Sequence, residues 1–431
     1  MGVHAQLWER HRAVMPGWLA LYYDEPIELV SGDGRRVTDA QGRVYLDLFG
    51  GILTTMTAHS LPEVVAAIQD QAGRILHSST LYLIRAQVEL AEEIARLAPM
   101  DDAKVFLTTS GTEANEAALL LATTARRSHQ VLALRNSYHG RSFATMAVTG
   151  NRGWSASALS PLDVKYVHGG YPYRSPFGHL DDDAYIDACV DDLRDVIATQ
   201  TAGDVACFIA EPIQGVGGFA VPPDGLFAAL AEVCDEHGIL WITDEVQTGW
   251  GRTGERFWGI EAHGVTPDVL TFAKGLGNGL SLAGVVAPAS LMDVVAANSI
   301  STFGGNPLSC AGALANLRYL LEHDLQSNAS RIGEQLLAGL RAIAATLPMI
   351  GDVRGKGLMI GLELVRPGTR DPDPGAATRV LEAARARGVL VGKGGLHGNV
   401  LRIAPPMTIT SEEAEEALEA LDGALREVAG S

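Results

Sequence analysis

The chain is poor in the features that mark several large classes of protein, beginning with cysteine. Its 431 residues include four cysteines, none in a CxxC pair. Scattered thiols of this kind do not suit a disulfide framework or a zinc site, so we predict buried, reduced thiols and no metal site. The four are Cys189, Cys207, Cys234 and Cys310.

Positive charge and long apolar runs are also scarce. Lysine and arginine number 33 against 51 acidic residues, which gives a formal net charge of −18. Such a surface repels nucleic acid and anionic lipid, so neither is expected as a partner. No apolar run approaches the length of a membrane span, and residues 1–12 lack the apolar core of a signal peptide. We therefore expect a cytoplasmic protein with no membrane partner.

What the chain does contain is enough apolar residues for a large core. It is 47% hydrophobic and 19% charged, as in ordinary globular proteins, and its length favours two domains over one. Short apolar runs alternate with helical patterns, which predicts an α/β fold with a mostly parallel sheet. The runs lie at 105–107, 131–134, 207–210, 239–242 and 269–272.

The pattern changes at two places. A run at 283–287 follows the previous one after too few residues for a crossover helix, so this strand should be antiparallel to its predecessor. Beyond about residue 320, helices and short strands at 358–364, 389–392 and 401–404 indicate a smaller α+β domain. Residues 366–375 are rich in proline and charge and predict a solvated loop.

Two residues at strand ends stand out for their chemistry. Asp244 follows the run ILWIT and Lys274 follows VLTFA. A lysine can hold an aldehyde cofactor as a Schiff base, and a carboxylate beside a pyridine nitrogen keeps that nitrogen protonated. Taken singly, each has a commoner explanation, a turn or helix cap for the aspartate and a solvated surface position for the lysine. Together they indicate pyridoxal 5'-phosphate (PLP) chemistry.

The carboxyl ends of the predicted parallel strands should bring further polar groups to the same edge of the sheet. Ser110, Glu211, Asp244 and Lys274 follow four of the runs in turn, and ligands of open α/β sheets bind at this edge. Ser110 with Glu113 also fits a capping box, and the same helix start could bind a phosphate.

An aromatic ring and an arginine follow the strand at 131–134. The ring of Tyr138 could stack on a planar cofactor or fill the core. Arg141, among small residues at a strand end, could have an anionic partner or a surface ion pair.

These segments together resemble the class III aminotransferases, a PLP-dependent family of fold type I. Seven motifs occur in the family's order, and the resemblance runs from about residue 25 to the C-terminus. The motifs are SGTEANE (110–116), YHGR (138–141), AEPIQGVGG (210–218), DEVQTGWGRTG (244–254), TFAKGLGNG (271–279), STFGGNP (301–307) and GDVRGKGLMIG (351–361).

The resemblance implies a domain division and a dimer. Residues 1–60 would form an N-terminal segment joining the small domain, 61–320 a large PLP-binding α/β domain, and 321–431 a small α+β domain. The family's active site is completed only in a homodimer, with a dimer of dimers as an alternative assembly. Thr302 would contact the cofactor phosphate of the neighbouring subunit.

The resemblance also assigns site residues, in the catalytic, cofactor and substrate parts of the site. Lys274 would carry PLP covalently and Asp244 would pair with its pyridinium. Gly111 and Thr112 would bind the phosphate, while Tyr138, His139, Val246 and Gln247 would surround the ring. Arg402 would hold the substrate carboxylate, Glu211 would pair with Arg402 in the absence of substrate, and Arg141 would hold a second carboxylate.

Substrate identity is less constrained. The residues of several motifs resemble those of the alanine–glyoxylate and β-alanine–pyruvate branch of the family. This resemblance favours pyruvate or glyoxylate as the acceptor of an amino group from an amino acid or ω-amino compound. Arg141 favours 2-oxoglutarate instead, and the segment around His397 resembles phospho-lyases acting on amino-alcohol phosphates. Racemisation and decarboxylation stay open. Two departures from the family's pattern, His59 in AHSLP and Trp250 in DEVQTGWG, weaken the transfer of substrate specificity.

Overall fold

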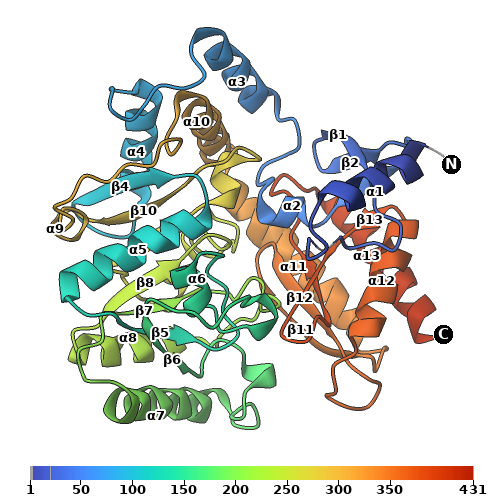
Figure 1. The fold of residues 1–431 in the computed structure, drawn as a ribbon. Coiled ribbons are helices and arrows are strands. Elements are labelled where there is room, and N and C mark those ends of the chain that lie inside the picture. The colour runs from blue at the N-terminus through green and yellow to red at the C-terminus, as the bar shows by residue number, and fades with distance from the viewer. Residues whose placement is uncertain (1–2, 20, 431) are drawn as a thin grey trace.

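The computed structural model describes residues 3–19 and 21–430 of the chain. It divides into a large part built on one seven-stranded sheet and a smaller part built on two four-stranded sheets (Figure 1). Within the described residues, no helix is both long enough and apolar enough to cross a membrane.

The large sheet is mostly parallel, as the sequence predicted. In their order across the sheet the strands are β4 (Ala103–Thr108), β10 (Ala283–Pro288), β9 (Val269–Phe272), β8 (Leu240–Asp244), β7 (Cys207–Ala210), β5 (Gln130–Leu134) and β6 (Asp163–Val167). Each neighbouring pair from β9 to β6 is parallel, whereas β10 is antiparallel to both β4 and β9. This confirms the direction expected for the run at 283–287.

Both faces of this sheet are covered because its strands are apolar on both sides. In β5, Leu132 and Leu134 join one buried cluster, whereas Val131 and Ala133 join another. Side chains of a strand alternate between its faces, so the two clusters are the two sides of the sheet. The first cluster includes residues of α4 (Arg85–Leu97), α7 (Asp182–Gln200), α8 (Leu226–Glu236) and α10 (Pro307–Glu322), and the second includes residues of α5 (Gly111–Arg126) and α6 (Phe143–Ala147).

Shorter elements complete the large part. α3 (Pro62–Arg74) packs on α10, and α9 (Ala289–Met292) follows β10. Four 3₁₀ turns lie in its loops: η1 (Arg152–Trp154), η2 (Pro172–Arg174), η3 (Gly259–His263) and η4 (Lys274–Gly277).

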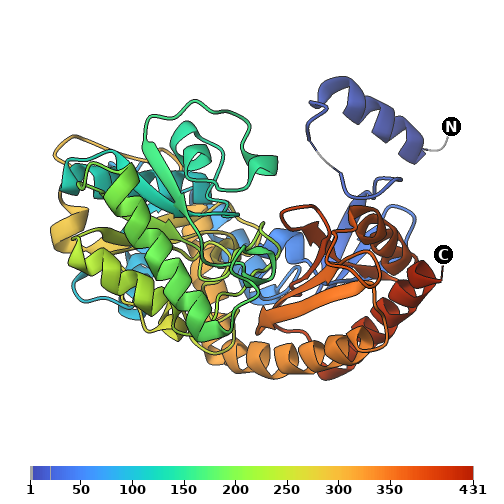
Figure 2. The same cartoon turned by 90° about the horizontal axis from the view of Figure 1, so that it is seen from below.

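The smaller part is joined to the large one by a long helix, α11 (Leu325–Ala344), which Figure 2 shows running from one part to the other. One of its sheets has the order β11 (Ile350–Lys356), β12 (Met359–Leu364), β15 (Val400–Ile403) and β14 (Gly392–Gly394). The other joins β1 (Leu29–Asp33), β2 (Arg36–Asp39) and β3 (Val44–Asp47) to β13 (Val389–Leu390). Helices α12 (Pro374–Ala386) and α13 (Ser411–Ala429) pack together, while α1 (Val3–Val14) and α2 (Gly50–Leu53) belong to the N-terminal segment.

Strand β13 pairs in parallel with β3, so the N-terminal segment and the C-terminal part share a sheet. The exact domain boundaries stay a prediction. The mostly parallel large sheet and the smaller α+β part are the α/β architecture that the sequence predicted.

Several strands were not predicted, or not divided correctly, from the apolar runs of the sequence. β6 alternates polar and apolar residues at the edge of the sheet, and every position of β11 is only partly buried, so neither forms a continuous apolar run. The run at 389–392 divides between β13 and β14, which belong to different sheets. A short run cannot show which sheet its residues join, because that depends on distant partners.

Candidate active site

The carboxyl ends of β4, β7, β8 and β9 open onto one cavity of about 260 Å³. Ser110, Glu211, Asp244 and Lys274, the four residues expected at this edge, all line it. The rest of the lining comes from the helix start after β4, the loops after β5, β7 and β8, and the N-terminal segment and small part of the molecule. These residues are Tyr22, Ile52, Gly111, Thr112, Asn115, Tyr138, His139, Gly140, Trp154, Val216, Val246, Gln247 and Arg402.

Asp244 is held in place by two buried side chains. Its Oδ2 atom accepts a hydrogen bond from Asn115 Nδ2 at 2.7 Å and lies 2.8 Å from His139 Nδ1. Asn115 Oδ1 in turn accepts from Thr271 Oγ1 at 2.7 Å. These hydrogen bonds fix the position of the carboxylate in the cavity wall.

Lys274 begins the turn η4 directly after β9. Its φ of +43° lies in the left-handed region, which is uncommon for a residue with a side chain and is often found at functional sites. The Lys274 amine has no hydrogen-bond partner among the described residues. Burial lowers the pKa of this amine to about 8, with a further contribution from the Arg402 charge, although Asp244 and Glu211 oppose the shift. More of this amine is neutral at neutral pH than of an ordinary lysine, so it is more available to attack an aldehyde or accept a proton.

The start of α5 lies at the cavity. Ser110 caps the helix by accepting a hydrogen bond from the Glu113 backbone N–H at 3.3 Å. A side chain at Gly111 would be tightly placed, because a Cβ atom there would lie 3.1 Å from both methyl groups of Val246. The remaining N–H groups and the positive end of the helix dipole face the cavity, which suits a phosphate.

Two buried polar atoms beside Asp244 and Val246 have no partner in the described chain. They are His139 Nε2 and Gln247 Oε1. Buried polar atoms are almost always hydrogen-bonded, so unpaired atoms in a cavity wall indicate a place for a polar ligand. The start of α5, the Asp244 carboxylate, the Lys274 amine and the Tyr138 and Val246 side chains all line the same cavity. This donor set fits PLP.

The far end of the cavity carries a buried positive charge. Arg402, on β15, is 2% exposed, and its guanidinium lies 4.8 Å from the Phe49 ring centroid. Its Nη1 donates to the Gly215 carbonyl at 3.3 Å and its Nη2 to the Lys393 carbonyl at 3.1 Å, while Nε has no partner within the described residues. A buried guanidinium that lacks an anionic partner is well suited to bind a carboxylate.

The family comparison agrees with this arrangement. The model of the family described as "Aminotransferase class-III" matches residues 22–425. The chain belongs to the class III aminotransferases. It is 39% identical, over 96% of its length and 86% of the relative's, to a mitochondrial alanine–glyoxylate aminotransferase 2 homologue of Arabidopsis thaliana.

Solved structures show the same fold along the whole chain. An (S)-enantioselective ω-transaminase from Thermomicrobium roseum superposes with a TM-score of 0.91 at 32% identity, covering 99% of both chains. A phospholyase from Arthrobacter in complex with phosphoethanolamine superposes with a TM-score of 0.89 at 34% identity, covering 97% of this chain and 99% of that one. This aminotransferase therefore uses PLP, and the part of PLP that each residue contacts stays a prediction.

One implied contact of the aminotransferase is not formed. Glu211 was expected to pair with Arg402, but its carboxylate accepts hydrogen bonds from the Tyr138 N–H at 2.9 Å and the Gly215 N–H at 2.8 Å. The two side chains are linked through Gly215, whose carbonyl is bound by Arg402. Burial raises the pKa of the Glu211 carboxyl to about 7, so it takes up a proton near neutral pH.

Two predicted site residues lie outside this cavity. Arg141 is exposed, and its guanidinium lies 5.4 Å from the centroid of the Trp18 ring. Thr302 is also exposed, in the loop before α10.

The two departures from the family's pattern lie outside the cavity lining as well. His59 Nε2 lies 2.8 Å from Asp47 Oδ2. Trp250 is buried, with its ring centroid 4.6 Å from that of Trp258 and 5.4 Å from that of Phe272. Trp250 therefore belongs to the core.

Sequence reasoning missed several contributors to the site. Asn115 and Thr271 hold Asp244, and Tyr22, Ile52 and Trp154 line the cavity. Asn115 lay within the SGTEANE motif on a helix turn that faces the sheet, which was a usable signal. Nothing local marks the other residues, because they reach the cavity only through the tertiary fold.

The lowered pKa of Lys274 leads to a pH prediction. The rate at which the PLP-free protein captures added PLP should rise with pH around a midpoint near 8, because only the neutral amine attacks an aldehyde. Capture is followed by the absorbance of covalently bound PLP from pH 6 to 10, with Lys274→Ala as the control that forms no covalent link. A midpoint near 10.5, the ordinary lysine value, would show that the cavity does not shift this pKa.

Proposed function

We propose that this aminotransferase moves an amino group from an amino acid or ω-amino compound to a small keto acid with one carboxylate, pyruvate or glyoxylate, by a ping-pong mechanism. The observation that supports this choice is the different placement of two arginines. Arg402 is buried in the cavity wall, whereas Arg141 is exposed outside the lining with its charge against Trp18. The cavity thus offers one carboxylate site. The alanine–glyoxylate relative supports the same acceptors.

Lys274, Asp244 and Arg402 have separate roles in the proposed amino transfer. PLP, when bound, supplies an electrophilic aldehyde and an electron-withdrawing ring. The Lys274 amine is the base placed to take a proton from the substrate Cα, and its lowered pKa leaves a substantial neutral fraction near pH 8. Asp244, supported by His139 and Asn115, keeps a proton on the pyridine nitrogen. Arg402 orients the substrate through its carboxylate.

Half-reactions test the substrate assignment directly. The PLP-loaded protein is mixed with single amino compounds, and loss of the PLP absorbance identifies the donors. Keto acids are then added one at a time, and the PLP absorbance should return with pyruvate or glyoxylate. Return with 2-oxoglutarate alone would contradict the proposal and favour a glutamate-dependent enzyme.

A second candidate is supported by one of the structural neighbours. The Arthrobacter phospholyase is named as a complex with phosphoethanolamine and is 34% identical to this chain. A lyase would release inorganic phosphate from phosphoethanolamine and leave the PLP form of the protein intact. A phosphate assay on the same samples therefore separates the two candidates.

The two arginines should differ in their effects on carboxylate substrates. Loss of a charged hydrogen-bond partner costs about 1.5–3 kcal/mol, so Arg402→Ala should lower kcat/KM by roughly tenfold to a hundredfold or more with every carboxylate substrate. Arg141→Ala should spare alanine and pyruvate and reduce any activity with glutamate and 2-oxoglutarate. Steady-state kinetics with each pair measures this. If Arg141→Ala impairs pyruvate turnover as much as Arg402→Ala does, the proposed single carboxylate site is wrong.

The protein is proposed to act as a homodimer. Apolar side chains are exposed on the segment before α4 and beside Thr302, including Leu83 at 98%, Leu81 at 75% and Phe303 at 61%. The rings of His77 and Phe303 lie 5.3 Å apart, so the two segments form one surface. Exposed apolar patches of this kind mark protein interfaces.

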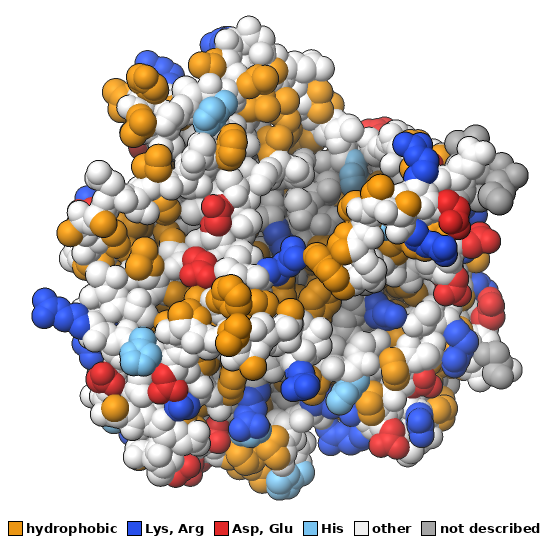
Figure 3. All heavy atoms as spheres, viewed as in Figure 1, with side chains coloured by type: hydrophobic (Ala, Val, Ile, Leu, Met, Phe, Trp, Pro, Cys, Tyr) orange, Lys and Arg blue, Asp and Glu red, His pale blue; other side chains and the backbone are white. Residues whose placement is uncertain are grey.

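The space-filling view in Figure 3 shows one face of the molecule hollowed between the large and small parts, with apolar side chains along the rim.

A subunit-mixing experiment tests the shared site. Lys274→Ala and Thr302→Ala proteins are mixed at a PLP concentration that leaves Thr302→Ala homodimers largely unloaded. Each hybrid dimer should contain one intact site, with Lys274 from one subunit and Thr302 from the other, so activity should appear on mixing. No activity after verified subunit exchange would count against a site shared between subunits.

A further inference from the structure

The loop after β7 is held by its carbonyl groups. Four successive carbonyls, at residues 215–218, each accept a hydrogen bond from a different residue. Gly215 is bound by Arg402 Nη1 at 3.3 Å, Val216 by the Gly395 N–H at 3.0 Å, Gly217 by Asn136 Nδ2 at 3.1 Å, and Gly218 by Arg354 Nη2 at 2.7 Å. Three of the four donors belong to the small part of the molecule, and the cavity is lined by Val216 of the loop.

Arg354 is the charged member of this set that lies outside the cavity lining. Its Nε and Nη2 atoms both donate to the Gly218 carbonyl, at 3.2 and 2.7 Å. Its Nη1 atom contacts Glu363 Oε2 at 2.8 Å and Asp352 Oδ2 at 2.7 Å. Two carboxylates therefore orient the guanidinium on one side, and its other side donates hydrogen bonds to the Gly218 carbonyl of the loop. The fixed planar geometry of arginine suits this double role.

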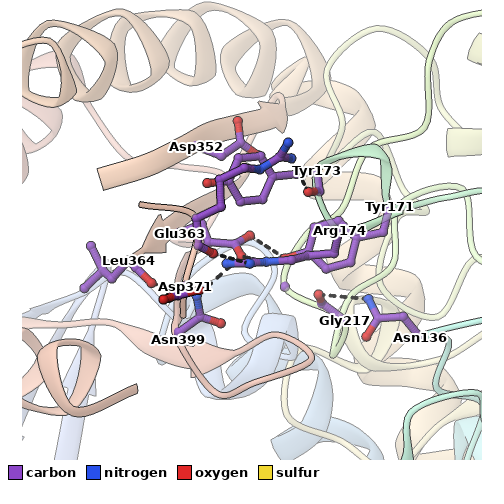
Figure 4. Close-up of polar contacts among 12 residues, drawn as sticks. Asn136, Tyr171, Tyr173, Arg174, Gly217, Asp352, Glu363, Leu364, Asp371 and Asn399 are labelled. Carbon is purple, nitrogen blue, oxygen red and sulfur yellow. Dashed lines mark hydrogen bonds and ion pairs between the residues drawn. The ribbon is translucent and has the colours of Figure 1, made fainter. Parts of the chain in front are cut away.

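A second arginine shares Glu363 but has no part in the loop. Arg174, in η2 of the large part, donates to Glu363 Oε1 at 2.6 Å, and the Tyr171 hydroxyl also donates to Glu363. The Glu363 side chain is fully buried, and those of Arg174 and Arg354 are 12% and 10% exposed. Figure 4 shows this cluster, with Glu363 and Asp352 on strands of the small part and Tyr171 and Arg174 on the large part.

The loop 215–218 packs closely against the backbone of the small part. A Cβ atom on Gly361 of β12 would lie 2.5 Å from the Gly218 carbonyl oxygen, so the loop rests directly on the strand backbone. At the other end, Gly215 donates its N–H to Glu211 and accepts from Arg402. A shift of this loop would therefore move the Gly215 contacts of both Glu211 and Arg402.

We propose that Arg354, braced by Glu363 and Asp352, is a positioning residue that sets the loop 215–218 and through it the Arg402 guanidinium for a substrate carboxylate. Arg354 is not among the residues that line the cavity. The inference rests on the proposed function, in which Arg402 binds that carboxylate.

The test compares Arg354→Lys with Arg174→Lys. Both variants keep a positive charge beside Glu363, and only the first loses the two-pronged contact with Gly218. The probe is propionate, a plain carboxylate, measured as an inhibitor of the PLP-loaded enzyme, together with kcat, the KM for pyruvate and Tm. Arg354→Lys should weaken propionate and raise the KM for pyruvate about tenfold, the effect of a lost charge-assisted hydrogen bond. The PLP absorbance and kcat should change little, and Arg174→Lys should leave propionate inhibition unchanged.

A double variant separates the route through Arg402 from a general loss of structure. Arg354→Lys should add little to the loss of propionate binding in Arg402→Ala, because both act on one contact. Wild-type propionate binding in Arg354→Lys, an equal loss in Arg174→Lys, or additive losses in the double variant would each overturn the inference. If Arg402→Ala itself binds propionate normally, the proposed function fails at its carboxylate site, and a separate effect of Arg354→Lys would have to be reassigned.

Discussion

Replacing Lys274 with alanine is expected to abolish amino transfer, with a fall in kcat of about 10²–10⁴-fold or more, because a positioned acid–base group contributes about that much. The cavity contains no second amine that could take its place among the residues that line it. The covalent link to PLP would be lost as well, so the variant should release the cofactor on dialysis. Turnover and the absorbance of bound PLP measure the two effects.

A matched lysine gives the control. Lys356 lies outside the cavity lining and pairs with Asp224 and Glu255 at 3.1 Å, so Lys356→Ala should keep activity and cost little stability. Borohydride reduction of the wild-type enzyme followed by peptide mapping should place the modification on Lys274. Modification of Lys356 or Lys393 instead would overturn the assignment of the site.

Replacing Asp244 with asparagine should give the second large loss. The neutral amide cannot hold a positive charge on the pyridine nitrogen, and it would also turn an N–H group toward Asn115 Nδ2 or His139. Loss of a charge-assisted contact costs about 1.5–3 kcal/mol, so kcat should fall roughly tenfold to a hundredfold or more. PLP should still be captured, because Lys274 is intact.

The control for Asp244 is another aspartate of the same sheet region. Asp268 Oδ2 accepts a hydrogen bond from the Trp241 N–H at 2.7 Å, outside the cavity lining. Asp268→Asn removes a negative charge of the same kind without touching the site, so kcat should be unchanged. If both variants lose the same activity, Asp244 acts through the fold and its role at the cofactor is wrong.

The larger features of the fold could be predicted because they depend on local pattern. Apolar runs such as 131–134 are buried on both faces and therefore lack polar alternation. The direction of β10 followed from the short connection after β9, which has no room for a crossover helix. β6 was missed because it lies at the edge of the sheet, where polar side chains are tolerated.

Sequence by itself determined the reactive groups and the edge at which they meet. Ser110, Glu211, Asp244 and Lys274 follow strands of the same direction, and the carboxyl ends of such strands share an edge, so their convergence needed no knowledge of side-chain contacts. The seven motifs around them occur in the family's order and were enough to predict the class III aminotransferase family and its cofactor, PLP.

The tertiary structure alone decided which of these groups are paired. Glu211 binds the loop backbone in place of Arg402, and Arg141 lies against Trp18 outside the cavity. The contact between Arg402 and Gly215 joins residues 187 positions apart, and that between Arg354 and Gly218 joins residues 136 apart. Hydrogen bonds require separations near 3 Å and a definite angle, which local sequence cannot specify across such distances. The packing of the small part against the loop 215–218 therefore set the position of the Arg402 guanidinium, the proposed carboxylate site.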